Sequence, residues 1–220
     1  MRKEIIQTKD GSNTLFVPEL NETYHSTNGA LQESLHVFIK EGLLYRNLKN
    51  IKILEVGFGS GLNALTTFVS AADSGLRVNY TSLEAYPLEW DSVAKLSYTE
   101  LEGMRKHHDV FRKMHSCSWG KNVPISVNFS LMKLNLKLQD ITFENAFDLI
   151  YFDAFAPQIQ PEMWTNEIFH LVFKSLRSKG ILVTYCAKGS VKRSLKAVGF
   201  ELQSIPGPPG KREMSRAVKK

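Results

Sequence analysis

The sequence has little cysteine and no long apolar run, and each absence excludes a class of protein. Its two cysteines, Cys117 and Cys186, stand in unrelated segments without a C-x-x-C pair, which favours free thiols over a disulfide framework or a redox motif. No stretch approaches the roughly 18 consecutive apolar residues of a membrane span. No apolar segment of the kind found in secretory signals follows the charged opening, Met1 to Glu4. We therefore expect a cytoplasmic protein.

The sequence also lacks a metal-binding pattern and any internal repeat. His107, His108 and His115 are spaced loosely among charged residues, which predicts a solvated helix face and no metal site. The 220 residues suffice for one α/β domain with a buried core. We expect residues 1–45 to form a small hairpin and a helix packed on the core, and residues 46–220 to form the main domain.

The net charge of +6 is unevenly distributed along the chain. From residue 174 to the end, twelve lysines and arginines stand against two acids, Glu201 and Glu213, a balance of +10. The remainder of the chain carries a balance of −4. A basic final quarter on a slightly acidic body is typical of proteins that bind a polyanion, with nucleic acid the first candidate. The charge alone fits a lysine-rich solvated surface equally well.

Residues 52–63 form the stretch around which the chain is organised. An apolar run containing the acid Glu55 is followed by Gly57, Gly59 and Gly61, and helical spacing then begins. This order predicts a strand, a tight turn and a helix N-terminus, the first half of a βαβ unit. Glycines allow the turn to adopt positive φ and let a ligand approach the backbone. The stretch is therefore a candidate ligand-binding loop.

The glycine spacing differs from a dinucleotide fingerprint, because Leu62 stands where G-x-G-x-x-G requires glycine. The carboxylate of Glu55 would repel a diphosphate and attract a cationic ligand. S-adenosylmethionine carries a sulfonium and an ammonium group, so E-x-G-x-G-x-G predicts a loop that binds this cofactor. The alternative is a plain turn whose glycines serve packing. The predicted cofactor contacts in the loop are Glu55, Gly57, Phe58, Gly59, Gly61 and Asn63.

Two further acids follow predicted strands. Glu84 ends the strand over 78–83 and lies where α/β nucleotide-binding units place an acid for ribose hydroxyls. Asp140 follows the alternating apolar run 123–138, whose change of parity predicts a bulge or bend near residues 132–133. Asp140 would accept a hydrogen bond from an adenine amino group, or alternatively cap the segment after it.

Later segments complete a recognisable order of elements. The apolar strand 147–152 delivers residues 153–157 to the same sheet edge, and the chain closes on an antiparallel pair over 200–205 and 213–219. Residues 4–17 predict a small N-terminal β-hairpin. Alternating strands and helices with a terminal hairpin predict a Rossmann-like α/β fold, that of class I S-adenosylmethionine-dependent methyltransferases.

Four stretches together resemble the tRNA 5-(aminomethyl)-2-thiouridine methyltransferase family. They are Glu55–Asn63, Phe152–Pro157, Pro161–Trp164 and Gly210–Met214, and the resemblance extends over most of the chain. In many bacteria this family forms the N-terminal half of a bifunctional tRNA-modifying enzyme, and in others it stands alone. No oxidoreductase half follows in this sequence, so we expect the stand-alone form.

The resemblance implies a reaction and a set of roles. A methyl group would pass from S-adenosylmethionine to the aminomethyl nitrogen on C5 of the wobble uridine, in the anticodon stem-loop of tRNA. The family's proposed catalytic acid falls on Asp153, and its cofactor contacts fall on the glycine loop, Glu84 and Asp140. Residues 24–26 match the family loosely, and Gln160 stands where the family often has asparagine. Both departures concern the substrate side.

Aromatic and basic residues are the candidates for contact with the tRNA. Phe155 and Trp164 would stack on a flipped-out base, with ordinary packing as the alternative, and Tyr24 belongs to the substrate-side loop. The basic candidates for phosphate contact are Lys188, Lys192, Arg193, Lys211 and Arg212. Another Rossmann-like transferase that acts on a small amine, such as an aminopropyltransferase, remains an alternative. A third hypothesis is an RNA-binding module without cofactor.

Overall fold

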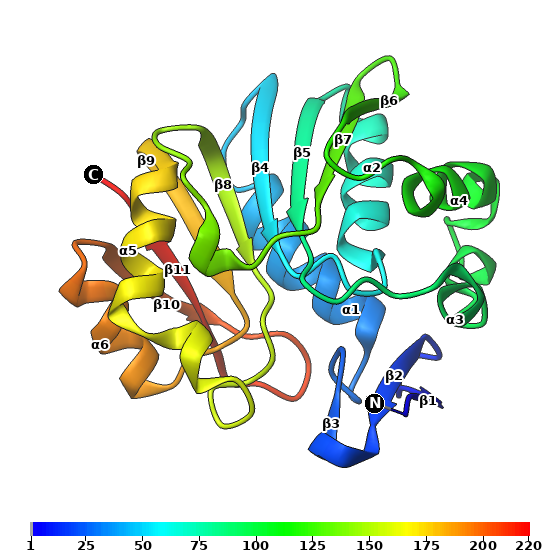
Figure 1. Cartoon of the computed structure of the whole chain (residues 1–220), viewed down its shortest axis with the longest axis horizontal. Helices are drawn as coiled ribbons and strands as arrows, with labels where there is room; N and C mark the ends of the chain where they lie inside the picture. Colours follow the sequence, from blue (N-terminus) through cyan, green and yellow to red (C-terminus); the bar gives the residue numbers. More distant parts are fainter. Residues whose placement is uncertain (1) are drawn as a thin grey trace.

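The computed structural model describes residues 2–220 and leaves Met1 outside the described residues. It contains an eight-stranded sheet in the order β10-β11-β9-β8-β4-β5-β7-β6 and a three-stranded sheet in the order β1-β2-β3 (Figure 1). The strands are β1 Glu4–Gln7, β2 Asn13–Val17, β3 Glu22–Thr23, β4 Asn50–Val56, β5 Arg77–Leu83, β6 Asn122–Ser126, β7 Phe129–Leu134, β8 Phe147–Phe152, β9 Leu176–Thr184, β10 Glu201–Pro206 and β11 Glu213–Val218.

The helices separate most of these strands along the chain. The α-helices are α1 Ala30–Ser34, α2 Leu62–Ser74, α3 Trp90–Ala94, α4 His108–Ser116, α5 Asn166–Ser175 and α6 Gly189–Ala197. A π-helical segment, η2 Leu35–Leu43, continues α1. Single 3-10 turns are η1 Pro18–Leu20, η3 Tyr98–Glu100, η4 Arg105–His107, η5 Leu138–Asp140 and η6 Pro161–Trp164. None of the helices within residues 2–220 is long and apolar enough to cross a membrane.

The centre of the large sheet is parallel and its edges are antiparallel. β4 pairs in parallel with β5 and β8, β5 with β7, and β8 with β9. β10 and β11 form the predicted closing hairpin, which joins the sheet through the antiparallel pair of β11 and β9. The Rossmann-like fold is confirmed. Because the carboxyl ends of β4, β5 and β8 share one edge, the loops that follow them come together there.

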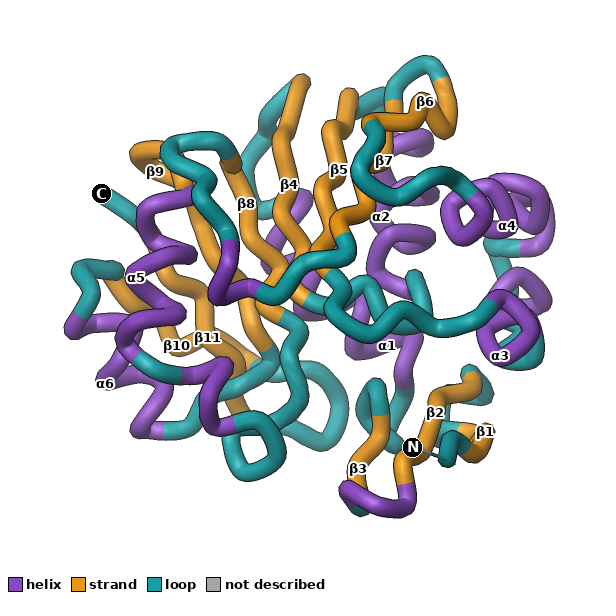
Figure 2. The backbone as a smooth tube through the Cα atoms, in the orientation of Figure 1, coloured by secondary structure: helices purple, strands orange, loops and turns teal. Residues whose placement is uncertain are grey.

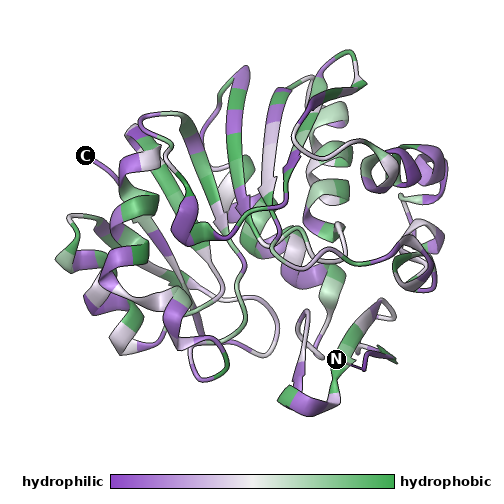
Figure 3. Cartoon of the chain, viewed as in Figure 1, coloured by the Kyte–Doolittle hydropathy of each residue, from purple (hydrophilic) through white to green (hydrophobic). Residues whose placement is uncertain are grey.

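The two faces of the large sheet bury different helices, because neighbouring strand residues point to opposite faces. Ile53 belongs to a buried cluster with η2 and α2, whereas Leu54 belongs to a cluster with α5 and α6. Figure 2 shows α5 and α6 together beside β9 to β11, with α1 and α2 on the other side of the central strands. Hydrophobic residues concentrate in those strands and in α2 (Figure 3).

The N-terminal sheet adds a third strand to the predicted hairpin. β1 and β2 pair antiparallel as expected, and β3 pairs with β2. Asp10 in the β1–β2 turn accepts a hydrogen bond from the backbone N–H of Gln32 at 2.9 Å, which joins the turn to α1. Leu15 of β2 packs in one cluster with Leu62 and Leu65 of α2. The boundary at residue 46 stays a prediction.

The bulge predicted near residues 132–133 was wrong. Residues 122–134 form an antiparallel hairpin of two strands, β6 and β7, and β7 pairs regularly with β5 through Leu134. The register irregularity lies in β6, between Pro124 and Ser126. The apolar alternation changes parity because Lys133, which is 1% exposed, takes the inward position of β7 after Leu131, and a non-strand segment follows Leu134. Cys117 and Cys186 are free thiols, as predicted.

Candidate active site

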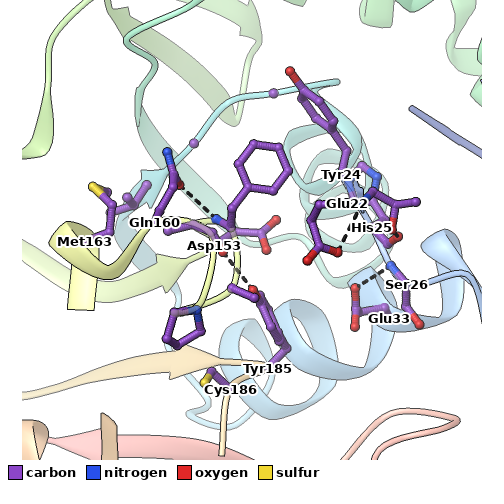
Figure 4. Close-up of a pocket in the computed structure, with 18 of the residues that line it drawn as sticks. Glu22, Tyr24, His25, Ser26, Glu33, Asp153, Gln160, Met163, Tyr185 and Cys186 are labelled. Atoms are coloured by element: carbon purple, nitrogen blue, oxygen red, sulfur yellow. Dashed lines mark hydrogen bonds between the residues drawn. The ribbon is translucent and has the colours of Figure 1, made fainter. Parts of the chain in front are cut away.

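A cavity of about 1240 Å³ opens at the carboxyl edge of the parallel strands. The glycine loop, the ends of β5 and β8 and the segment after β9 line its sheet side. Segments from the two ends of the chain, residues 21–27 and 211–213, line the opposite side. Figure 4 shows Asp153 between Gln160 and Met163 on one side and Glu22, Tyr24 and Glu33 on the other.

The three glycines of the loop all have positive φ but serve different purposes. A Cβ on Gly57 would lie 3.0 Å from the backbone oxygen of Asp153, and one on Gly61 would lie 2.6 Å from Nε2 of His115. Gly57 and Gly59 line the cavity, together with Phe58, whereas Gly61 precedes α2 and is buried away from it. Gly61 is therefore needed for packing against His115, the alternative considered for the whole loop. Gly57 and Gly59 expose the backbone to a ligand.

Glu84 is fixed at the cavity wall by the backbone. Its Oε2 accepts the N–H of Gly59 at 2.9 Å and its Oε1 accepts the N–H of Tyr86 at 2.8 Å. A carboxylate has about four acceptor sites, so further lone pairs remain for a ligand. A ribose diol would donate to such a group. The structure brings Glu84 and the glycine loop together, as the sequence predicted.

Glu55 lies behind the loop and not on the cavity wall. Its side chain is 0% exposed, and Oε2 accepts the hydroxyl proton of Ser82 at 2.6 Å. Oε1 has no hydrogen-bond partner among residues 2–220. Burial raises the pKa of this carboxyl well above its ordinary value. In this structure Glu55 is therefore not in a position to contact a cationic ligand in the cavity directly.

Asp153 is the first residue after β8 and lines the cavity. Its Oδ2 accepts a hydrogen bond from Nδ2 of Asn63 at 2.8 Å. The pKa of Asp153 is raised to about 7: burial and, to a smaller extent, the nearby Glu33 raise it, and the hydrogen bond from Asn63 and the charge of Lys211 partly offset them. A carboxyl group in this range takes up and releases protons near neutral pH.

An ion pair from the two ends of the chain stands beside Asp153. Nζ of Lys211 lies 2.5 Å from Oε2 of Glu33 and 3.9 Å from the ring centre of Tyr185. The hydroxyl of Tyr185 donates to the backbone oxygen of Ala154 at 2.9 Å. Glu33 and Tyr185 were not predicted as site residues, because neither belongs to a motif. Lys211 was predicted as a phosphate contact, and the structure pairs it inside the cavity instead.

The two predicted aromatic residues nearest the cavity form a pair. Tyr24 and Phe155 both line it and meet edge to face, with ring centroids 5.2 Å apart and planes at 85°. Oε1 of Gln160 accepts the backbone N–H of Phe155 at 3.1 Å, which holds that segment in place. The pair offers an apolar wall for a planar ligand.

Trp164 and Asp140, two further predicted contacts, also lie outside the cavity. Trp164 is 6% exposed and donates its Nε1–H to the backbone oxygen of Phe155 at 2.9 Å, so packing is its role in this structure. Asp140 is exposed in η5, whereas Gln139 beside it lines the cavity. The cofactor contact predicted for Asp140 stays a prediction, and the structure places Gln139, not Asp140, on the cavity wall.

The basic residues of the final quarter divide into three groups. Lys188 and Arg212 are exposed and line the mouth of the cavity. Lys192 forms an ion pair with Glu213 at 2.7 Å. Arg193 is exposed on α6 and does not line the cavity. Among residues 2–220 no group of three or more His, Cys, Asp or Glu side chains is placed to hold a metal ion.

These residues fit S-adenosylmethionine. Gly57 and Gly59 leave backbone exposed on the cavity wall, and Glu84 presents spare acceptors to hydroxyl groups beside them. The cavity is large enough to hold a cofactor and a second ligand, because ligand pockets typically measure about 300–1,000 Å³. Asp153 lies between the cofactor side and the paired Glu33 and Lys211.

Proteins similar to this chain include long bifunctional enzymes. It is 30% identical to the tRNA 5-methylaminomethyl-2-thiouridine biosynthesis bifunctional protein MnmC of Cupriavidus metallidurans, over 97% of this chain and 33% of that protein. The identity to the protein of the same name from Leptospira interrogans is 32%, over 89% of this chain and 32% of that protein. The chain thus spans about a third of the length of these relatives.

Solved structures and a family model add to this similarity. The structure of MnmC2 from Aquifex aeolicus superposes with a TM-score of 0.80 at 27% identity, over 100% of this chain and 70% of that one. A spermidine synthase from Thermotoga maritima superposes with a TM-score of 0.54 at 15% identity, over 99% and 72% of the two chains, and so shares the fold alone. A model of the S-adenosyl-L-methionine-dependent methyltransferases matches residues 102–220, more than half of the chain, and the chain therefore belongs to this family.

Proposed function

We propose that this chain methylates the 5-aminomethyl group of the wobble uridine or thiouridine in the tRNA anticodon stem-loop, in the cytoplasm. The product with a thiouridine is 5-methylaminomethyl-2-thiouridine. The observation that carries the proposal is the Asp153 carboxyl group, whose pKa burial raises to about 7 and which faces the cavity lined by the glycine loop. The MnmC relatives, named for biosynthesis of this nucleoside, support the choice of substrate.

The proposed chemistry requires a base near neutral pH. An aminomethyl group is largely protonated at that pH and has no free lone pair. Asp153 would bind the ammonium, accept one of its protons and leave the nitrogen lone pair directed at the methyl donor. S-adenosylmethionine supplies a methyl group on a positively charged sulfur. Holding the nitrogen in line with that methyl group provides much of the rate enhancement in such reactions.

The cavity supports recognition of a base that has left its stack. Tyr24 and Phe155 form the apolar wall on which a uracil ring would lie, since every base offers a flat face to an aromatic side chain. Lys188 and Arg212, which line the cavity, would contact phosphates of the same loop. Trp164 contributes indirectly through its hydrogen bond to Phe155.

The test is methyl transfer to tRNA isolated from cells that lack the protein, followed by mass analysis of the nucleosides. Asp153→Asn should lower kcat by a factor of about 10² or more, the low end for a lost acid–base group, while affinity for S-adenosylmethionine changes little. Asp140→Asn is the matched control, because Asp140 lies outside the cavity, and it should keep full activity.

Two results would contradict the proposal. One is the absence of methyl transfer to 5-aminomethyl uridines while the cofactor binds. The other is group transfer to a small amine such as putrescine at a rate above that for tRNA, which would favour the alternative function of a small-amine transferase. Equal losses of turnover and cofactor affinity in Asp153→Asn would make Asp153 a cofactor contact.

A further inference from the structure

We propose that Asn63, held by Ser34, is a positioning residue that keeps the Asp153 carboxylate oriented and in its charged form for the acceptor amine. This inference rests on the function proposed above, because it concerns the base of that reaction. It changes the role predicted for Asn63, which the sequence places among the cofactor contacts. The three side chains come from three elements, α1, α2 and the segment after β8.

The geometry is a chain of short hydrogen bonds that ends at Asp153. Oγ of Ser34 donates to Oδ1 of Asn63 at 2.8 Å, and Nδ2 of Asn63 donates to Oδ2 of Asp153 at 2.8 Å. The hydroxyl of Thr66 lies 2.8 Å from Oγ of Ser34. The Thr66 hydroxyl also lies 3.0 Å from the backbone oxygen of Leu62 and 3.1 Å from that of Asn63, to which it can donate. Because each hydroxyl has one proton, Ser34 donates to Asn63 when the proton of Thr66, and not that of Ser34, occupies the contact between the two hydroxyls. Ser34, Asn63 and Thr66 are all buried.

This chain fixes which way the Asn63 amide faces. Ser34 donates to the oxygen, so the nitrogen is turned toward Asp153. A flipped amide would present Oδ1 to Asp153, which suits a protonated carboxyl group and repels a carboxylate. In that orientation the proton of Ser34 would have to turn to Thr66. The bond from Ser34 to Oδ1 therefore favours the orientation in which Asn63 donates to a charged Asp153.

Other charged and titratable groups act on Asp153 from the elements packed around it. They are Glu33 in α1, Glu55 in β4, Tyr80 in β5, Tyr185 after β9 and Lys211 in the β10–β11 loop. Among residues 2–220, Asn63 is the one residue that donates a hydrogen bond to the Asp153 carboxyl group. Its removal acts on the carboxylate directly, whereas the other groups act through space.

The expected result is a shift in the titration of Asp153. In Asn63→Ala the carboxylate loses a hydrogen bond, so its pKa should rise by roughly one to two pH units. Ser34→Ala should shift it in the same direction by less, and this small change at a buried serine keeps the test available if Asn63→Ala does not fold. The acidic limb of kcat against pH should move upward by the same amounts.

The matched control is Thr67→Val. Thr67 is a buried residue of the same helix whose hydroxyl donates to the backbone oxygen of Asn63 at 2.6 Å and does not touch its side-chain amide. Its loss should leave the titration of Asp153 in place. Affinity for S-adenosylmethionine, measured by calorimetry, should change less than twofold in Ser34→Ala and little in Asn63→Ala.

The titration should be measured without tRNA, by NMR of protein labelled with ¹³C at aspartate carboxyl carbons, with Asp153→Asn assigning the signal. This readout tests the hydrogen-bond chain from Ser34 to Asp153 even if the protein methylates a different substrate. Failure of this inference can therefore be distinguished from failure of the proposed function. An unchanged or lowered pKa in both Asn63→Ala and Ser34→Ala would overturn the inference. So would a loss of cofactor affinity in Asn63→Ala with the Asp153 titration unchanged, which would restore Asn63 as a cofactor contact.

Discussion

Two substitutions in the Glu33–Lys211 pair should move the pH dependence of the enzyme in opposite directions. Glu33 raises the pKa of Asp153 and Lys211 lowers it, and both act on a group whose pKa burial has brought to about 7. Lys211→Met removes the cation and leaves the buried carboxylate of Glu33 without its partner, so both consequences raise the pKa of Asp153. Glu33→Gln removes the anion and leaves Lys211 free to stabilise the Asp153 carboxylate, so the pKa falls.

The size of the effect follows from the surroundings. An opposite charge within about 4–6 Å shifts a carboxyl pKa by roughly 1–3 units, and the partial exposure of Lys211 favours the lower end. A rise of about one unit would reduce the ionised fraction of Asp153 at pH 7 from about a half to about a tenth. At pH 7, kcat of Lys211→Met should therefore fall about fivefold, and it should recover toward the wild-type rate near pH 9.

The assay is kcat measured from pH 5.5 to 9 with saturating tRNA and S-adenosylmethionine. Lys188→Met is the control, because Lys188 lines the same cavity but its ammonium bonds the neutral side chain of Gln158. The acidic limb of kcat against pH for Lys188→Met should coincide with that of the wild type. If Lys211→Met and Glu33→Gln shift the acidic limb in the same direction, or neither shifts it, the charge pair does not act on the Asp153 carboxyl group.

Three further predictions concern the loop, the core and the surface. Gly59→Val, at φ +50° with the Tyr24 ring 3.5 Å from a new Cβ, should lower S-adenosylmethionine affinity more than tenfold by calorimetry, whereas Gly103→Val, at φ +78° in open space, should not. The pKa of Glu55 is raised in the folded state. Its contribution to the free energy of unfolding is therefore fully present below the unfolded-state pKa of about 4.5, and it is lost as the pH rises toward the folded-state pKa. The Tm of Glu55→Gln should accordingly decline less than that of the wild type between pH 5 and 8. Arg193→Glu with Lys196→Glu on α6 should raise the KM for tRNA and reduce its salt slope by roughly 0.7–0.9 per lost contact, and an unchanged slope would remove α6 from the interface.

The sheet and the side of the cavity that it lines were predictable because they depend on local patterns. A run of apolar residues followed by closely spaced glycines predicts a strand and a turn, and the parallel order places Gly57, Glu84 and Asp153 at one edge. Each of these residues lies at or just after a strand end. Their proximity follows from topology without knowledge of side-chain packing.

Side-chain direction was less accessible from the sequence. Glu55 lies within β4, one residue before its end, so its side chain points to a face of the sheet and not out of its edge. It meets Ser82 on the neighbouring strand in the core. Trp164 and Asp140 are likewise in segments that reach the cavity, but packing decides that Met163 and Gln139 face it instead.

The side of the cavity opposite the sheet was not predictable, because it combines segments from both ends of the chain. Glu33 and Lys211 are separated by 178 positions, and no periodicity connects them. Their contact depends on the closing hairpin reaching the start of α1, where Gly210 approaches the side chain of Asn28 too closely for a Cβ. Residue types in either segment alone give no indication of the other.

This division between core and ends explains why the fold does not identify the acceptor. The spermidine synthase that shares the fold at 15% identity has a comparable sheet, and a sheet edge with a glycine loop suits any donor of the same kind. On the function proposed here, the acceptor would meet residues that line the cavity but do not belong to the sheet: Tyr24, Glu33 and Lys211. Substitutions in the N-terminal segment and the closing hairpin should therefore alter the choice of acceptor while cofactor affinity is retained, whereas substitutions in the glycine loop should do the reverse.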